Sequence, residues 1–344
     1  MKKILLSLSV FTLISVLTAC QLGVDEGDKV VTVYSERHYD TDQQLYDKFE
    51  EETGITVNVV KAKADELMNR LEIEGEDTEA DVLIISDAGK LYQAKERGLL
   101  QSIDSDTLDT NIPANYRDTE DYWFGLTMRA RVIVYHPERV SVEDLSTYEA
   151  LAGTEWMNRV VIRSSTNIYN QSLIASLIEV NGETSTRDFI SGLVDNFART
   201  PEGNDRDQAK AVMAGTADVA ILNTYYMGKM ANSSDPYEVE VAEGLRIFFP
   251  NQDTTGTHVN ISGAGVTSEA DNADYAIQLI EFLSSEYAQG IFAEANYEYP
   301  VNPNVDPSEL LQSWGTFTPQ DISLTTLGVN NELAAIIMDE EGWE

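Results

Sequence analysis

Two adjacent tyrosines, Tyr225 and Tyr226, carry the most informative chemistry in the sequence. They follow the apolar run 218–222, which predicts a buried strand that ends and turns toward a helix. In open α/β sheets, ligands bind at the carboxyl ends of the strands. The pair therefore places two phenol oxygens at a binding position, and hard oxygen donors suit a small, highly charged cation such as ferric iron.

Two further tyrosines lie at equivalent corners. Tyr39 follows the predicted strand 30–34, and Tyr169 follows the predicted strand 159–163 and a polar turn. A phenol has a pKa near ~10, so a phenolate at neutral pH needs a metal ion that deprotonates its ligand. Four phenolates on a trivalent cation leave one negative charge, which Arg129 could balance. The alternative is packing at the edge of the core, the common role of tyrosine in a chain that has 16 of them.

Strand and helix patterns alternate along the chain, which predicts an α/β fold with a mostly parallel sheet. Strands are expected at 30–34, 55–60, 82–85, 129–135, 159–163, 218–222 and 245–249, and a strand with a glycine turn is expected at 257–266. Helices are expected at 41–53, 64–73, 89–97, 206–214, 272–283, 285–295 and 331–338, with one more from Ser165.

The α/β pattern forms two series, joined by extended crossings near Arg129 and Leu245. Two lobes with two connections form a hinge, and the natural binding site is the cleft between them. We expect lobe 1 to comprise residues 30–128 and 251–305, and lobe 2 to comprise residues 129–250 and 306–344.

The beginning of the sequence has the features of a secretory signal. Two lysines precede the apolar stretch 4–17, which is shorter than the ~20 residues needed to span a bilayer. The ending Leu-Thr-Ala-Cys resembles a bacterial lipobox. It predicts a signal peptide at 1–19, lipid on Cys20 and a flexible tether at 20–29; a retained membrane anchor is the alternative. With its only cysteine lipidated, the mature chain would have no disulfide and no nucleophilic thiol.

The formal net charge is -36, from 59 acidic and 23 basic side chains. Such a surface repels nucleic acid and excludes a phosphate-backbone partner. Two explanations are compatible with it: solubility in salty surroundings, and attraction of cations, which salt would largely screen.

Several motifs in order resemble the ferric-ion-binding proteins of bacterial ABC iron importers, and most closely their tyrosine-rich Fut branch. The motifs are YSERHYDTD at 34–42, GLTMRARVIVY at 125–135, LNTYY at 222–226, THVNISGAG at 257–265 and NYEYPVNP at 296–303. The resemblance implies a type II periplasmic-binding fold. It also implies an exported, lipid-anchored, monomeric receptor that carries Fe(III) to an ABC permease, without an organic cofactor.

The resemblance also assigns roles to individual residues. It makes iron ligands of the four tyrosines, Tyr39, Tyr169, Tyr225 and Tyr226. Arg129 matches the family's arginine behind the ligands, and His38 matches a histidine that lines the site. A possible anion-binding turn is formed by Ser165, Thr166 and Asn167. The glutamate that binds iron in another branch has no secure match.

Two other functions stay open at this stage. A protein of the same fold could bind a small anion, such as phosphate or a carboxylate, through Arg129 and the turn 164–167. An exported enzyme on a two-lobed scaffold would need a positioned acid–base pair or nucleophile, and no such pairing is visible in the sequence. The oxidation state of the bound iron also stays open, because an arginine that turns toward or away from the site could favour Fe(III) or Fe(II).

Overall fold

A computed structural model describes residues 29–37 and 39–344. The expected signal peptide, Cys20, most of the tether and His38 lie outside the described residues. The strands are β1 (Val30–Ser35), β2 (Thr56–Lys61), β3 (Val82–Ile85), β4 (Leu100–Gln101), β5 (Phe124–Tyr135), β6 (Val160–Val161), β7 (Val219–Asn223), β8 (Arg246–Phe248), β9 (Val259–Thr267) and β10 (Tyr299–Pro300). The longer helices in lobe 1 and at the C-terminus are α1 (Asp40–Thr53), α2 (Ala64–Glu74), α3 (Ala88–Glu96), α10 (Ala273–Ser284), α11 (Glu286–Asn296) and α14 (Asn331–Glu340). Those in lobe 2 are α5 (Ile168–Asn181), α6 (Glu183–Asp195), α7 (Asp205–Met213), α8 (Thr224–Ala231) and α9 (Pro236–Gly244). Three short helices are α4 (Asp106–Asn111), α12 (Glu309–Ser313) and α13 (Thr325–Val329).

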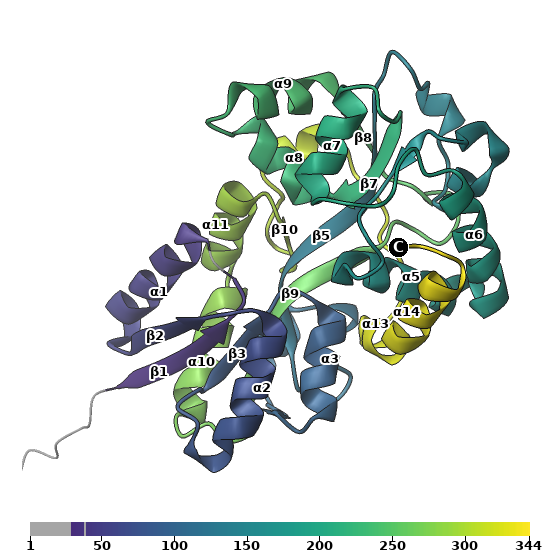
Figure 1. Cartoon of the computed structure of the whole chain (residues 1–344). Helices are drawn as coiled ribbons and strands as arrows, with labels where there is room; N and C mark the ends of the chain where they lie inside the picture. Colours follow the sequence, from purple (N-terminus) through teal and green to yellow (C-terminus); the bar gives the residue numbers. More distant parts are fainter. Residues whose placement is uncertain (1–28, 38) are drawn as a thin grey trace, which may run out of the picture.

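The strands form a mixed sheet in the order β2-β1-β3-β9-β5-β7-β6. β1 is parallel to β2 and β3, and β6 is parallel to β7, as the strand–helix alternation predicts. β5 and β9 instead run antiparallel to their neighbours in the middle of the order. Helices cover the sheet in each lobe (Figure 1), so central strands such as β3, with the sequence VLII, are buried on both faces.

β5 is the strand that joins the two lobes. All its residues are buried; its first part pairs with β9 and its last part pairs with β7 and β8. The sequence pattern placed the start of this strand at Arg129, but the strand begins at Phe124. The pattern failed there because Gly125 and Thr127 interrupt the apolar residues in a buried segment that pairs with β9 and β10.

A second segment passes between the lobes from β8 to β9, and Tyr148 ties it to β5. The Tyr148 hydroxyl donates to the Arg131 carbonyl of β5 and accepts from the His258 amide at 3.2 Å. The His258 ring is buried, and its Nδ1 lies 3.3 Å from the Gln320 side-chain oxygen. Burial lowers the pKa of His258 to about 3, so this histidine is a neutral structural group of the crossing.

The C-terminal helices pack between the lobes. α13 contacts α3 of lobe 1 and α5 of lobe 2, and α14 continues along α5 (Figure 1). The approach to α3 is close, because a Cβ on Gly328 would overlap the Tyr92 ring. Within the described residues, no helix combines the length and the apolar character needed to cross a membrane.

Gly263 and Gly265 lie inside β9 rather than in the turn that the sequence pattern suggested. A Cβ on Gly263 would lie 2.7 Å from the Phe124 carbonyl oxygen and from a Leu91 methyl group. The absence of a side chain therefore allows β9 to lie close to β5 and α3.

We predict that Gly263→Ala lowers the free energy of unfolding by about 1–3 kcal/mol, because the added methyl group must displace packed backbone. The matched control is Gly290→Ala in α11, where a Cβ meets nothing within 4 Å. That substitution should stabilise the helix by about 0.5–1 kcal/mol. Urea denaturation measures both, and a Gly263→Ala protein as stable as the wild type would contradict the close packing.

Candidate metal centre

Three of the four predicted tyrosines come from two helix starts in lobe 2. Tyr169 lies in the first turn of α5, where the Asn167 side chain caps the helix by accepting from the Tyr169 amide at 3.2 Å. Tyr225 and Tyr226 lie in the first turn of α8, directly after β7. The Tyr225 hydroxyl donates to the Tyr169 oxygen at 3.2 Å, and the centres of the Tyr225 and Tyr226 rings lie 4.2 Å apart. The strand ends thus bring the three phenols together.

Tyr39 reaches the same place from lobe 1. It precedes α1 at the end of the turn after β1. Its ring lies 3.4 Å from the ammonium nitrogen of Lys229, which belongs to α8 of lobe 2. Together with Tyr169, Tyr225 and Arg129, it lines an enclosed cavity of about 90 Å³. This volume suits a single ion with a few water molecules.

Tyr226 is placed differently from the other three. It lines a neighbouring cavity of about 710 Å³, which also includes Tyr169, Thr166 and Asn167. The four predicted tyrosines are therefore adjacent, and Tyr169 is the tyrosine that lines both cavities. Ser165 lines neither cavity, and its amide donates to the Glu344 carbonyl at 3.2 Å. Of the predicted anion turn, only Thr166 and Asn167 face open space.

Arg129 lies in the middle of β5 and is buried. One guanidinium nitrogen donates to the Ser86 carbonyl, and the guanidinium carbon lies 5.3 Å from the centre of the Tyr169 ring. The other nitrogen, Nη1, is buried and has no hydrogen-bond partner among the described residues. A buried cationic donor without a partner favours negative charge in this cavity.

Burial keeps three phenols of this site protonated. It is the largest cause of a raised pKa for Tyr39, Tyr225 and Tyr226. Neighbouring acids and phenols add to it: Glu298 raises the pKa of Tyr39, and Asp205 raises that of Tyr225 and of Tyr226. These phenols can become phenolates at neutral pH only if a bound cation supplies the missing charge.

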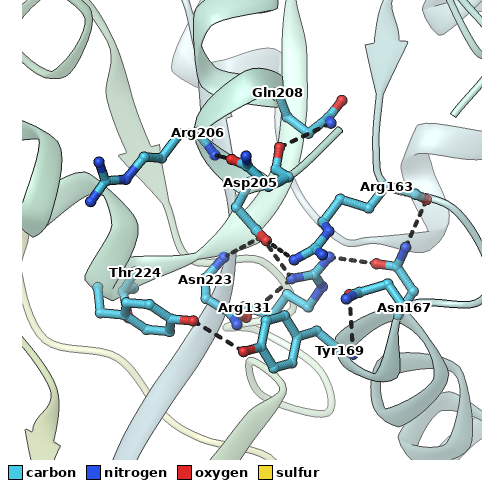
Figure 2. A network of polar contacts seen from close by, with 12 residues as sticks. Arg131, Arg163, Asn167, Tyr169, Asp205, Arg206, Gln208, Asn223 and Thr224 are labelled. Atoms are coloured by element: carbon cyan, nitrogen blue, oxygen red, sulfur yellow. Dashed lines mark hydrogen bonds and ion pairs between the residues drawn. The ribbon is translucent and has the colours of Figure 1, made fainter. Parts of the chain in front are cut away.

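A buried ion network lies beneath the lobe 2 tyrosines (Figure 2). The Asp205 carboxylate, at the start of α7, binds Arg131 at 3.3 Å and Arg163 at 2.6 Å. The Asp205 carboxylate also accepts from the backbone N–H of Asn223 at 3.3 Å. Arg131 donates to the side-chain oxygen of Asn223 at 3.1 Å and to that of Asn170. Because Asn223 and Asn170 adjoin the helix turns that carry the tyrosines, the network fixes those turns.

Sequence reasoning missed several charged residues at the site. Glu36 and Glu298 line the 90 Å³ cavity with Arg37, and Lys229 faces Tyr39. Glu298 and Arg37 lie within the quoted motifs 296–303 and 34–42, so the motifs contained them without indicating their role. No group of three or more histidine, cysteine, aspartate or glutamate side chains with metal-binding geometry occurs in the part of the chain that the structure describes.

Comparison with known proteins identifies the family. The family model described as bacterial extracellular solute-binding protein matches residues 44–319. The chain belongs to this family. The solute-binding protein is 49% identical to "Iron uptake protein A1" of Synechocystis, over 91% of this chain and 87% of the relative.

Solved structures agree with this assignment. A Trichodesmium IdiA/FutA protein in complex with iron and citrate is 48% identical and superposes with a TM-score of 0.90 over 92% of this chain and 100% of its own. Apo FutA2 from Synechocystis is 44% identical, with a TM-score of 0.88 over the same shares. The expected type II periplasmic-binding fold and the resemblance to ferric-ion-binding proteins are confirmed.

We predict that Asp205→Ala lowers the free energy of unfolding by about 3–5 kcal/mol, because Arg131 is left as an uncompensated buried cation. The control is Asp188→Ala on α6, an exposed position, where the change should stay within about 0.5 kcal/mol. Guanidinium denaturation monitored by circular dichroism measures both. Equal losses in the two variants would show that the network does not hold the lobe together.

Proposed function

We propose that this solute-binding protein captures ferric iron outside the cytoplasm and delivers it to an ABC permease. The observation that carries the proposal is the convergence of phenols from both lobes around a small, buried cavity. A trivalent oxygen-seeking cation fits this donor set, whereas softer metals prefer nitrogen or sulfur. Relatives named for iron uptake and ferric iron binding support the same cargo.

In this proposal the ligands are Tyr39, Tyr169, Tyr225 and Tyr226. Closing the lobes completes the site, since Tyr39 is the ligand that lobe 1 contributes. Arg129 lies behind the ligands and balances the excess negative charge of four phenolates. Lys229 lies over the Tyr39 ring. Burial lowers the pKa of its ammonium to about 8, and the negative charge of Glu298 partly offsets this effect.

The two other functions fit the site less well. A free anion in the 90 Å³ cavity would be repelled by Glu36 and Glu298, which line it beside Arg129. The relatives include iron-uptake and ferric-iron-binding proteins, which supports a carrier rather than an enzyme. The bound ion is therefore cargo.

The proposal extends to the ends and the boundaries of the chain. Cys20 carries the lipid that anchors the monomeric receptor to the outer face of a membrane, with 1–19 removed and 20–29 as the tether. The lobes divide as 30–128 with 251–305, and 129–250 with 306–344. Because α13 contacts both lobes, the segment 306–344 also forms part of the surface that slides or bends when the cleft closes.

We predict that adding chelated ferric iron to the purified protein produces a visible absorption band, because phenolate-to-Fe(III) charge transfer absorbs visible light. The double variant Tyr225→Phe/Tyr226→Phe should lose most of the band while retaining its far-ultraviolet circular dichroism. Tyr92→Phe, in α3 and outside the site, is the matched control and should keep the full band. A wild-type protein that stays colourless would refute the ligand set.

We also predict that iron binding releases one proton for each coordinating phenol. The raised pKa values keep Tyr39, Tyr225 and Tyr226 protonated in the empty protein at neutral pH, so the affinity for iron must rise as pH rises. A pH-stat titration with ferric chelate counts the protons, and Tyr225→Phe should release one fewer than the wild type. Binding without proton release would contradict phenolate coordination.

A further inference from the structure

A buried arginine lies under the turn that carries Tyr39. Arg37 is 3% exposed, and its guanidinium is bound on two sides by carboxylates. Nε and Nη2 lie 3.0 and 3.1 Å from the two oxygens of Asp42. Nη1 and Nη2 each lie 3.1 Å from one oxygen of Glu298. The two carboxylates thus engage three nitrogens of the planar group, a geometry that a lysine could not reproduce.

These bonds connect three separate parts of lobe 1. Asp42 belongs to the first turn of α1, and Glu298 lies next to β10, 261 residues from Arg37 in the sequence. Arg37 also donates to the Thr127 hydroxyl of β5 at 3.3 Å. The arginine therefore joins the turn after β1 to α1, to β5 and to the segment before β10.

Tyr39 is held directly beside this cluster. The Arg37 guanidinium carbon lies 5.1 Å from the centre of the Tyr39 ring and 5.0 Å from that of Phe292. Glu298, which binds the arginine, lines the same small cavity as Tyr39. The ring of Tyr39 thus contacts both the Arg37 cluster in lobe 1 and Lys229 in lobe 2.

Stability alone gives a poor explanation for such a cluster. The cost of removing charges from water often equals or exceeds their mutual attraction, so apolar residues of similar volume would serve the core as well. What the cluster does supply is geometry, because a multidentate arginine fixes the turn far more strictly than apolar packing. Tyr39 lies two residues after Arg37, so a turn that the arginine fixes also fixes the position of Tyr39.

We propose that Arg37, clamped by Asp42 and Glu298, is the positioning residue for Tyr39. It fixes the one phenol that lobe 1 contributes, so that closure adds this oxygen to the iron in a single geometry. The inference rests on the proposed function, because it concerns the fourth ligand of the same iron site. Without the clamp, the protein would hold iron through the lobe 2 tyrosines alone.

The test uses Arg37→Lys and Glu298→Gln, which keep size and hydrogen-bonding capacity but lose the paired geometry. Both should weaken iron retention against a competing chelator by about 10–100-fold, the usual effect of removing a partner of a metal ligand. Both should also move the visible band to the position seen in Tyr39→Phe. Arg139→Lys, which alters an ion pair with Asp218 away from the tyrosines, should change neither.

A double-mutant cycle separates positioning from general damage to the fold. Adding Arg37→Lys or Glu298→Gln to Tyr39→Phe should cause no further loss of iron retention. The inference would be overturned if the double variants lost as much iron retention, relative to Tyr39→Phe, as the single variants lose relative to the wild type. It would also be overturned if Arg37→Lys and Glu298→Gln both kept the visible band of the wild type. If Arg37→Lys does not fold, Glu298→Gln alone carries the test. A wild-type protein that binds no ferric iron would instead refute the proposed function, and the inference with it.

Discussion

The proposed iron site depends on the conflict between buried phenols and the charge that they must adopt to bind a metal. Burial raises the pKa of Tyr39, Tyr225 and Tyr226, so the empty site is neutral at these positions. A cation strong enough to displace the protons reverses that preference and converts the same phenols into a tight cage. Selectivity for a highly charged, oxygen-seeking ion follows from this cost, because a weakly charged ion cannot offset it.

Each lobe contains a buried ion network beneath its tyrosines. In lobe 2, Asp205 joins Arg131 and Arg163 beneath the helix starts that carry three tyrosines. In lobe 1, Arg37 joins Asp42 and Glu298 beneath Tyr39. β5 runs through both networks, since it contributes Thr127 to one and Arg131 to the other. Pre-formed ligand turns on separate lobes suit a receptor that must open to release its cargo.

Much of this arrangement could be predicted from sequence. The strand 82–85 was placed residue for residue, and strand-to-helix corners were the right places to look for Tyr39, Tyr169 and Tyr225. Local patterns succeed there because apolar runs and helix starts are encoded by neighbouring residues.

The rest depended on contacts between distant residues. Nothing near Arg37 in the sequence indicates Glu298 as its partner, and nothing singles out Asp205 among 59 acidic side chains. The start of β5 was missed because pairing with β9 and β10 keeps Gly125 and Thr127 inside a buried strand. The separate cavity beside Tyr226 depends on packing that no periodicity describes.

The most direct test of the account is a crystal structure of the iron-loaded protein, with anomalous diffraction measured at the iron edge. The account predicts one iron peak bonded to the phenol oxygens of Tyr39, Tyr169, Tyr225 and Tyr226, with Arg129 behind them. An iron peak bound by carboxylates instead, or a closed protein in which Tyr39 does not reach the metal, would contradict it.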